Sequence, residues 1–102
     1  MKYRNKHIVV TGGTSGIGLE LVKKLASEND VIVISKKGVL PESLVSGENS
    51  IKLYHANLAN RAEIESVVDA IQKRYRSIEV LINNAAMQCT PEFLADDFNF
   101  DS

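Results

Sequence analysis

Two hydrophobic patterns alternate along the chain. Short, continuous runs rich in β-branched residues occur at positions 8–10, 31–34 and 80–82, and a more mixed run occurs at 51–54. Runs of this length and composition are typical of strands buried on both faces, as in a parallel sheet. The pattern therefore predicts four strands.

The segments between these runs carry helical periodicity. From about Gly16 to Ser27 the apolar residues line one face, and after Asn60 they recur at the spacing of an amphipathic helix. Asn60, with Glu63 three positions later, forms a variant of the capping box. Residues 38–47 contain a proline and predict a loop with at most a brief helix. The apolar positions are Leu21, Val22, Leu25 and Ala26 in the first helix and Ile64, Val67, Val68, Ile71 and Tyr75 in the second.

The order of these elements, β-α-β-(short α)-β-α-β, predicts an α/β fold with a parallel sheet and right-handed crossovers. A chain of 102 residues accommodates one domain at most, so we predict a single domain over residues 1–102. After Ala85 the periodicity stops, and positions 90–102 mix aromatic and acidic residues without an established pattern.

A glycine-rich segment, Thr11-Gly12-Gly13-Thr14-Ser15-Gly16-Ile17-Gly18, lies between the first predicted strand and the first predicted helix. Glycine permits positive φ angles and lets backbone N–H groups approach a ligand closely. The first turn of a helix adds unpaired N–H groups and the positive end of the helix dipole. The segment therefore predicts a pyrophosphate-binding loop.

The spacing of the glycines assigns them different tasks. We expect Gly12 at the tight exit from the strand, Gly16 where the phosphate comes closest, and Gly18 at the contact between helix and strand. Thr14 and Ser15 offer hydroxyl groups to the same anion, cap the helix, or do both. The spacing Gly-x-x-x-Gly-x-Gly departs from the commoner Gly-x-Gly-x-x-Gly. Because no Gly-Lys-Ser/Thr sequence ends the loop, a nucleoside triphosphatase is disfavoured.

Composition narrows the partners and the compartment. The 12 basic and 13 acidic residues give a net charge of -1, which predicts no affinity for nucleic acid or for an anionic membrane. No apolar run is long enough to span a bilayer, and the polar N-terminus does not resemble a secretory signal. The single cysteine, Cys89, fits a reducing compartment, so the cytoplasm is the predicted location. His7 and His55 lack the spacing of metal ligands, so no metal site is predicted.

The sequence Asn83-Asn84-Ala85-Ala86 ends the fourth predicted strand. Together with the glycine-rich segment, it resembles the short-chain dehydrogenase/reductase family from about Lys6 to Ala86. The resemblance implies a Rossmann-type parallel sheet with helices on both faces, here about four strands of a larger doubly wound sheet, which binds NAD or NADP. It also implies that Gly12, Gly16, Ile17 and Gly18 hold the pyrophosphate. Residues Asn83 to Ala85 would run beside the adenosine ribose and brace the sheet.

Two positions depart from the family pattern. Ala86 stands where the second motif usually ends in glycine, which places one methyl group near the cofactor without removing binding. Asn57, followed by Leu58, stands where the family usually has an aspartate that accepts from the adenine amino group. The Asn57 amide can accept from that group and donate to the neighbouring ring nitrogen, or Asn57 is a turn residue before the helix. Asn57, Leu58 and Ala86 are therefore candidate cofactor contacts.

The end of the second predicted strand indicates NADP rather than NAD. A carboxylate there would bind the ribose hydroxyls of NAD and repel the 2′-phosphate of NADP. Ser35 occupies that position, and Lys36 and Lys37 follow it. A hydroxyl and two ammonium groups suit a phosphate, although a lysine pair can also be simply solvated. NADP is the predicted cofactor and NAD the alternative. A methyltransferase also has a glycine loop after its first strand, but it needs an acidic residue for the ribose at the end of the second strand. Ser35 and Lys36 stand there instead, which argues against a methyltransferase.

We do not expect this chain to contain the catalytic residues of the family. The family uses a serine and a Tyr-x-x-x-Lys pair, whose tyrosine is the general acid/base. Four positions after the three tyrosines stand a histidine, a leucine and a glutamate, so none begins that pair. We expect the N-terminal dinucleotide-binding part of an oxidoreductase, inactive by itself. The alternative is a non-catalytic dinucleotide-binding or sensing module.

In the strand order that the resemblance implies, 3-2-1-4 continuing outwards, the fourth strand is internal. Here the run at positions 80–82 would instead form an uncovered apolar strand at the edge of the sheet. The unpaired N–H and C=O groups of an edge strand are a template for pairing with another chain. We therefore expect a homo-oligomer or association through this edge, or that the segment is part of a longer chain.

Overall fold

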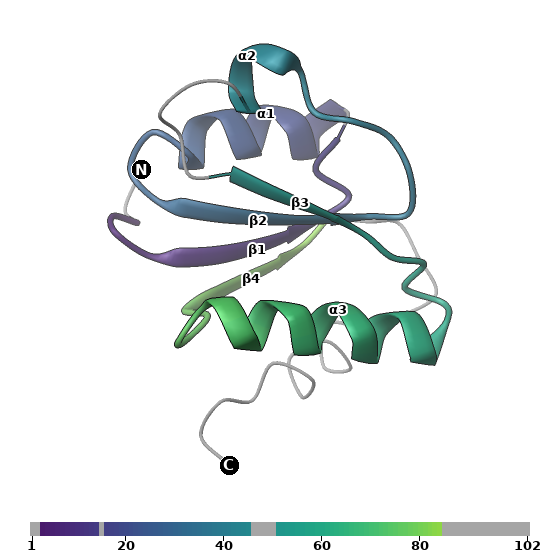
Figure 1. The fold of residues 1–102 in the computed structure, drawn as a ribbon. Helices are drawn as coiled ribbons and strands as arrows, with labels where there is room; N and C mark the ends of the chain where they lie inside the picture. The colour runs from purple at the N-terminus through teal and green to yellow at the C-terminus, as the bar shows by residue number, and fades with distance from the viewer. Residues whose placement is uncertain (1–2, 15, 46–50, 85–102) are drawn as a thin grey trace.

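The computed structural model describes residues 3–14, 16–45 and 51–84 of the chain (Figure 1). Its four strands form one parallel sheet with the order β3-β2-β1-β4. This is the predicted Rossmann-type arrangement, in which successive crossovers place helices on both faces of the sheet. The elements are β1 (His7–Thr11), α1 (Gly16–Leu25), β2 (Asp30–Ser35), α2 (Glu42–Val45), β3 (Ile51–His55), α3 (Arg61–Arg74) and β4 (Val80–Asn83).

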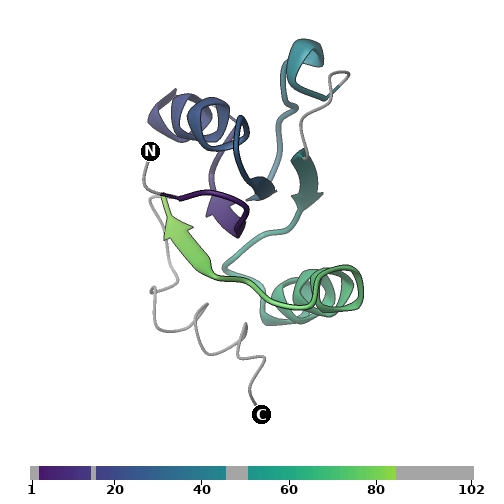
Figure 2. The same cartoon turned by 90° about the vertical axis from the view of Figure 1, so that its left-hand side faces the viewer.

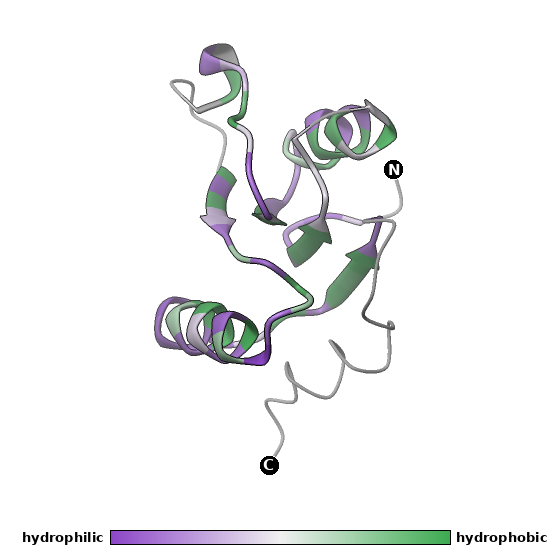
Figure 3. Cartoon of the chain, turned by 90° about the vertical axis from the view of Figure 1, so that its right-hand side faces the viewer, coloured by the Kyte–Doolittle hydropathy of each residue, from purple (hydrophilic) through white to green (hydrophobic). Residues whose placement is uncertain are grey.

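The sheet separates two hydrophobic layers. Figures 1 and 2 show α1 and α2 on one side of the sheet and α3 on the other. Because side chains alternate across a strand, Ile8 and Val10 of β1 pack with Val22 and Leu25 of α1, whereas Val9 packs with the α3 layer. Figure 3 shows hydrophobic central strands between helices that each carry a hydrophobic and a hydrophilic side. The apolar positions predicted for α3 are its buried face: Ile64, Val67, Val68 and Ile71.

Helix α1 ends at Leu25, two residues before the predicted limit at Ser27. The reason is Asn29, a buried side chain whose Nδ2 donates to the Leu25 carbonyl at 3.0 Å and to the Tyr3 carbonyl at 3.1 Å. Its Oδ1 accepts from the backbone N–H of Lys6 at 3.0 Å. Asn29 thus joins the end of α1 to the start of β1, a contact that helical periodicity does not reveal.

Only half of the predicted capping box forms at the start of α3. Asn60 is the N-cap, and its Oδ1 accepts from the Glu63 backbone N–H at 3.3 Å. The Glu63 carboxylate does not return to the cap; it accepts from the backbone N–H of Asn57 at 2.9 Å. The Asn60 N–H instead donates to the Asn57 carbonyl. The Glu63 carboxylate, which a complete capping box would place on the Asn60 N–H, therefore binds the turn before α3 instead.

Strand β4 is half-buried along its whole length, unlike the fully buried centres of β1 and β2. Among the described strands it pairs with β1 alone and lies at one edge of the sheet. Association through this edge stays a prediction. None of the helices in the described ranges combines the length and hydropathy that crossing a membrane requires.

Candidate functional site

The carboxyl ends of all four strands meet at one edge of the sheet. Thr11 is aligned with Ile34 on one side and Asn83 on the other, and Ser35 is aligned with His55. The residues that follow these strands therefore come together. In open α/β sheets this is the edge where ligands bind, at the point where the strand order reverses. Here that point lies between β1 and β4.

The glycine loop adopts the backbone that only glycine takes without strain. Gly12 has a φ of 71° and Gly16 a φ of 57°. A Cβ atom placed on Gly16 would meet no atom within 4 Å apart from its chain neighbours and the backbone of its own helix, so the space beside Gly16 is open. Ile17, next in the helix, is 81% exposed. Ser15 lies outside the described residues. This open first turn can present its backbone N–H groups to an anion.

Gly18 is enclosed where Gly16 is open. A Cβ atom at Gly18 would lie 2.3 Å from the Gly12 carbonyl oxygen and 2.5 Å from Asn84 Nδ2. Asn84 Nδ2 in turn donates to the Gly12 carbonyl at 3.1 Å. Helix α1, the glycine loop and the end of β4 therefore touch at Gly18, which has the packing role that its position in the motif predicts. Asn84 belongs to the stretch from Asn83 to Ala85 that is expected beside the ribose, but its side-chain bond to the glycine loop was not predicted.

Thr11 joins β1 to β4 directly below the loop. Its fully buried Oγ1 donates to Asn83 Oδ1 at 2.7 Å and accepts from the Asn84 backbone N–H at 3.1 Å. The side chain of Asn83 thus contacts β1, at the base of the site. Thr11 was not predicted as a site residue from the sequence. The feature that could have identified it is a hydroxyl residue at the end of an otherwise apolar strand. Ala85 and Ala86 lie outside the described residues.

The turn after β2 folds back toward the glycine loop. Ser35 Oγ donates to the Lys37 carbonyl at 2.7 Å and lies 3.4 Å from Thr14 Oγ1. Gly38 has a φ of 103°, and a Cβ atom there would lie 2.9 Å from Thr14 Oγ1. The Lys36 and Lys37 side chains are exposed at this turn. The structure therefore brings the predicted phosphate and ribose positions into one neighbourhood.

Asn57 and Leu58 follow β3 and are engaged locally. Asn57 Oδ1 accepts from the Ala59 backbone N–H at 2.9 Å, so Asn57 has the role of a turn residue. The Leu58 side chain is buried in the hydrophobic layer next to α3. The leucine side chain is therefore not exposed at this edge.

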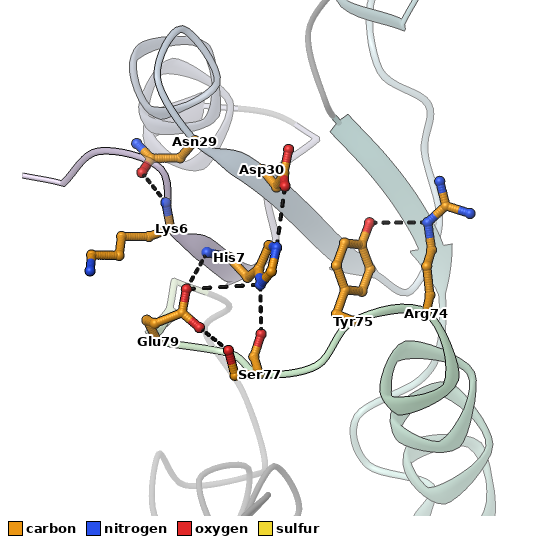
Figure 4. Close-up of polar contacts among 8 residues, drawn as sticks. All are labelled: Lys6, His7, Asn29, Asp30, Arg74, Tyr75, Ser77 and Glu79. Carbon is orange, nitrogen blue, oxygen red and sulfur yellow. Dashed lines mark hydrogen bonds and ion pairs between the residues drawn. The ribbon is translucent and has the colours of Figure 1, made fainter.

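The opposite edge of the sheet carries a closed polar network (Figure 4). His7 Nδ1 donates to the Ser77 carbonyl at 2.9 Å, and its Nε2 lies 3.3 Å from Asp30 Oδ2. The Glu79 carboxylate accepts from the His7 backbone N–H at 2.8 Å and from the Ser77 hydroxyl. Burial alone would raise the pKa of Glu79, but these hydrogen bonds, with the electrostatic influence of His7 and Lys6, lower it. In the part of the chain that the structure describes, no three His, Cys, Asp or Glu side chains gather to hold a metal ion.

Comparisons with known proteins agree with this architecture. The sequence profile of the family described as short chain dehydrogenase matches residues 6–100. The chain is 32% identical over 94 residues to DltE, an uncharacterized oxidoreductase of Bacillus subtilis, with 91% of this chain and 37% of that protein aligned. It is 34% identical over 88 residues to the D-beta-hydroxybutyrate dehydrogenase of Cupriavidus necator, with 81% of this chain and 34% of that protein aligned.

A solved relative has a similar fold. The aldohexose dehydrogenase of Thermoplasma acidophilum, in its ligand-free form, superposes with a TM-score of 0.66 at 29% identity, covering 87% of this chain and 33% of that chain. The chain thus spans about a third of the length of the curated relatives that it matches.

Proposed function

Because the chain belongs to the short-chain dehydrogenase family, we propose that residues 1–102 form the dinucleotide-binding part of an NAD(P)-dependent oxidoreductase. The family binds a nicotinamide dinucleotide, which supplies or accepts a hydride when bound. The observation that carries the proposal is the contrast between Gly16 and Gly18. One glycine leaves open space at the start of α1, while the other closes the helix against the sheet.

The pyrophosphate would lie over the first turn of α1. Backbone N–H groups of the loop and the positive end of the helix dipole favour an anion there. The residues that would hold it are Gly12, Thr14, Ser15, Gly16, Ile17 and Gly18. Gly18 contributes by fixing the helix, because it is packed against the Gly12 carbonyl. Gly16 contributes open space and a backbone conformation suited to close approach.

The adenosine would extend toward the ends of β2, β3 and β4. We propose that Lys36, with Lys37 beside it, binds the 2′-phosphate of NADP, which two ammonium groups would favour over the hydroxyl of NAD. Ser35 would support this contact by holding the turn through its bond to the Lys37 carbonyl. The Asn57 amide group and the Leu58 backbone would border the adenine. Asn83, Ala85 and Ala86 would border the ribose. The serine and the Tyr-x-x-x-Lys pair that transfer the proton would come from outside these residues.

Calorimetric titration of the full chain with NADPH and NADH tests this proposal. We expect NADPH to bind more tightly, and Lys36→Glu to weaken NADPH at least about tenfold while sparing NADH, since it replaces attraction to the phosphate with repulsion. Lys52→Glu is the matched control, because Lys52 is an exposed lysine of β3 away from the site edge. Tighter binding of NADH would refute NADP preference. Failure of both dinucleotides to bind would refute the proposed function.

A further inference from the structure

His55 lies at the end of β3, and its side chain contacts the turn that follows β2. The imidazole Nε2 is 2.7 Å from the Gly38 carbonyl oxygen. A carbonyl oxygen only accepts, so the ring nitrogen donates and the bond fixes the tautomer with hydrogen on Nε2. This bond links two segments that belong to different strands of the sheet.

The turn is held at both of its ends. At its start, the Ala56 backbone N–H donates to the Ser35 carbonyl at 3.0 Å, which extends the pairing of β2 and β3 by one step. At its end, His55 holds the Gly38 carbonyl. Lys36 and Lys37 lie between these two points, and the bond from Ser35 Oγ to the Lys37 carbonyl closes the turn internally at 2.7 Å.

Gly38 also contacts the glycine loop. Its φ of 103° is a backbone conformation that favours glycine, and a Cβ atom there would lie 2.9 Å from Thr14 Oγ1. The same residue is therefore confined by His55 on one side and by Thr14 on the other. A displacement of Gly38 would move the lysine pair relative to the first turn of α1.

We propose that His55 is a positioning residue for cofactor choice, which holds the turn at residues 35–38 so that Lys36 and Lys37 are directed at the 2′-phosphate of NADP. This inference rests on the proposed function and adds a residue that does not itself touch the cofactor. Lysine side chains are flexible, so the direction of their charge depends on where their backbone is held. Ordering the backbone before binding reduces the entropy lost when the phosphate is bound.

The test compares dissociation constants for NADPH and NADH in the full chain. His55→Ala is expected to weaken NADPH by about three- to tenfold, the range of one lost hydrogen bond, and to leave NADH unchanged. His55→Gln, which retains a neutral donor, is expected to restore most of the preference. Gly38→Ala, which strains the same point from the other side, is expected to lower the preference as well.

The control is His7→Ala, which removes another histidine bonded to a backbone carbonyl, at the opposite edge of the sheet. It is expected to leave the ratio of the two dissociation constants unchanged. The inference is overturned if His55→Ala and Gly38→Ala both keep the ratio, or if His55→Gln fails to restore it, which would indicate a direct effect of histidine charge. If the unsubstituted chain binds neither dinucleotide, the proposed function fails first.

Discussion

The two edges of the sheet are built differently. At the amino-terminal edge, side chains satisfy one another and the backbone: His7 contacts Ser77 and Asp30, and Glu79 accepts from His7 and Ser77 (Figure 4). At the carboxyl-terminal edge, Gly16 leaves open space and Ile17 is 81% exposed. The first arrangement leaves little for a ligand to bind, whereas the second presents backbone donors and charge.

The difference indicates a division between stability and binding within one small sheet. Changes at the amino-terminal edge should alter the free energy of unfolding and spare cofactor affinity. Changes at the carboxyl-terminal edge should alter cofactor affinity. Those at positions where the glycine loop packs against other residues should also alter the free energy of unfolding. Gly18 belongs to this last group, because it is both part of the loop and enclosed by it.

The largest effect is expected from Gly18→Ala. The new methyl group would lie 2.3 Å from the Gly12 carbonyl oxygen, a backbone atom that cannot move without shifting the loop. We expect the free energy of unfolding to fall by about 1–3 kcal/mol, as for other overpacked sites, and dinucleotide binding to be lost. Urea unfolding followed by circular dichroism, with a cofactor titration, measures both.

Gly16→Ala is the matched control for that substitution. Its methyl group meets no atom within 4 Å beyond its chain neighbours and its own helix backbone, so its cost to stability arises from the φ of 57°, about 1 kcal/mol. If Gly18→Ala were as stable as the unsubstituted protein, the enclosure of Gly18 would not be the reason for glycine at this position.

A smaller effect is expected from His7→Ala at the opposite edge. The substitution removes the bond to the Ser77 carbonyl, the partly exposed contact with the Asp30 carboxylate and the edge-on contact with the Tyr75 ring. Together these losses should lower the free energy of unfolding by about 1–2 kcal/mol. Urea unfolding measures the change. A parallel loss of NADPH affinity would contradict the separation of the two edges.

The smallest effect concerns the pH dependence that Glu79 introduces. Its pKa is lowered in the folded protein below the ordinary value of 4.5, so its contribution to stability is present above that value. The contribution is lost as the pH falls through the lowered folded pKa. Glu79→Gln should therefore reduce the loss of stability on acidification below about pH 4.5.

Urea midpoints measured from pH 7 to pH 3 would check this prediction. The control is Glu65→Gln, which removes an exposed carboxylate of α3 that pairs with Arg61. Equal pH profiles for Glu79→Gln and the unsubstituted protein would show that the Ser77 and His7 bonds do not hold the charged form.

Local signals made much of the fold predictable. Periodicity identified the strands and helices, because the spacing of apolar residues within a short stretch shows whether one face or both faces of an element are buried. Asn60 as a helix cap and Gly12 as a turn residue followed from the conformations that these residue types favour. The helix limit at Ser27 and the partner of Glu63 were wrong. The Asn29 side chain occupies the Leu25 carbonyl, and the Asn57 backbone N–H occupies the Glu63 carboxylate.

The sequence by itself determined the order of elements, the glycine loop and the family, because each is encoded in neighbouring residues. Only the tertiary structure decided which residues support that loop. Thr11 and Asn83 are 72 residues apart, and His55 and Gly38 are 17 apart. Such pairs meet because strand order and register align the carboxyl ends of the strands, and no short stretch of sequence specifies that alignment.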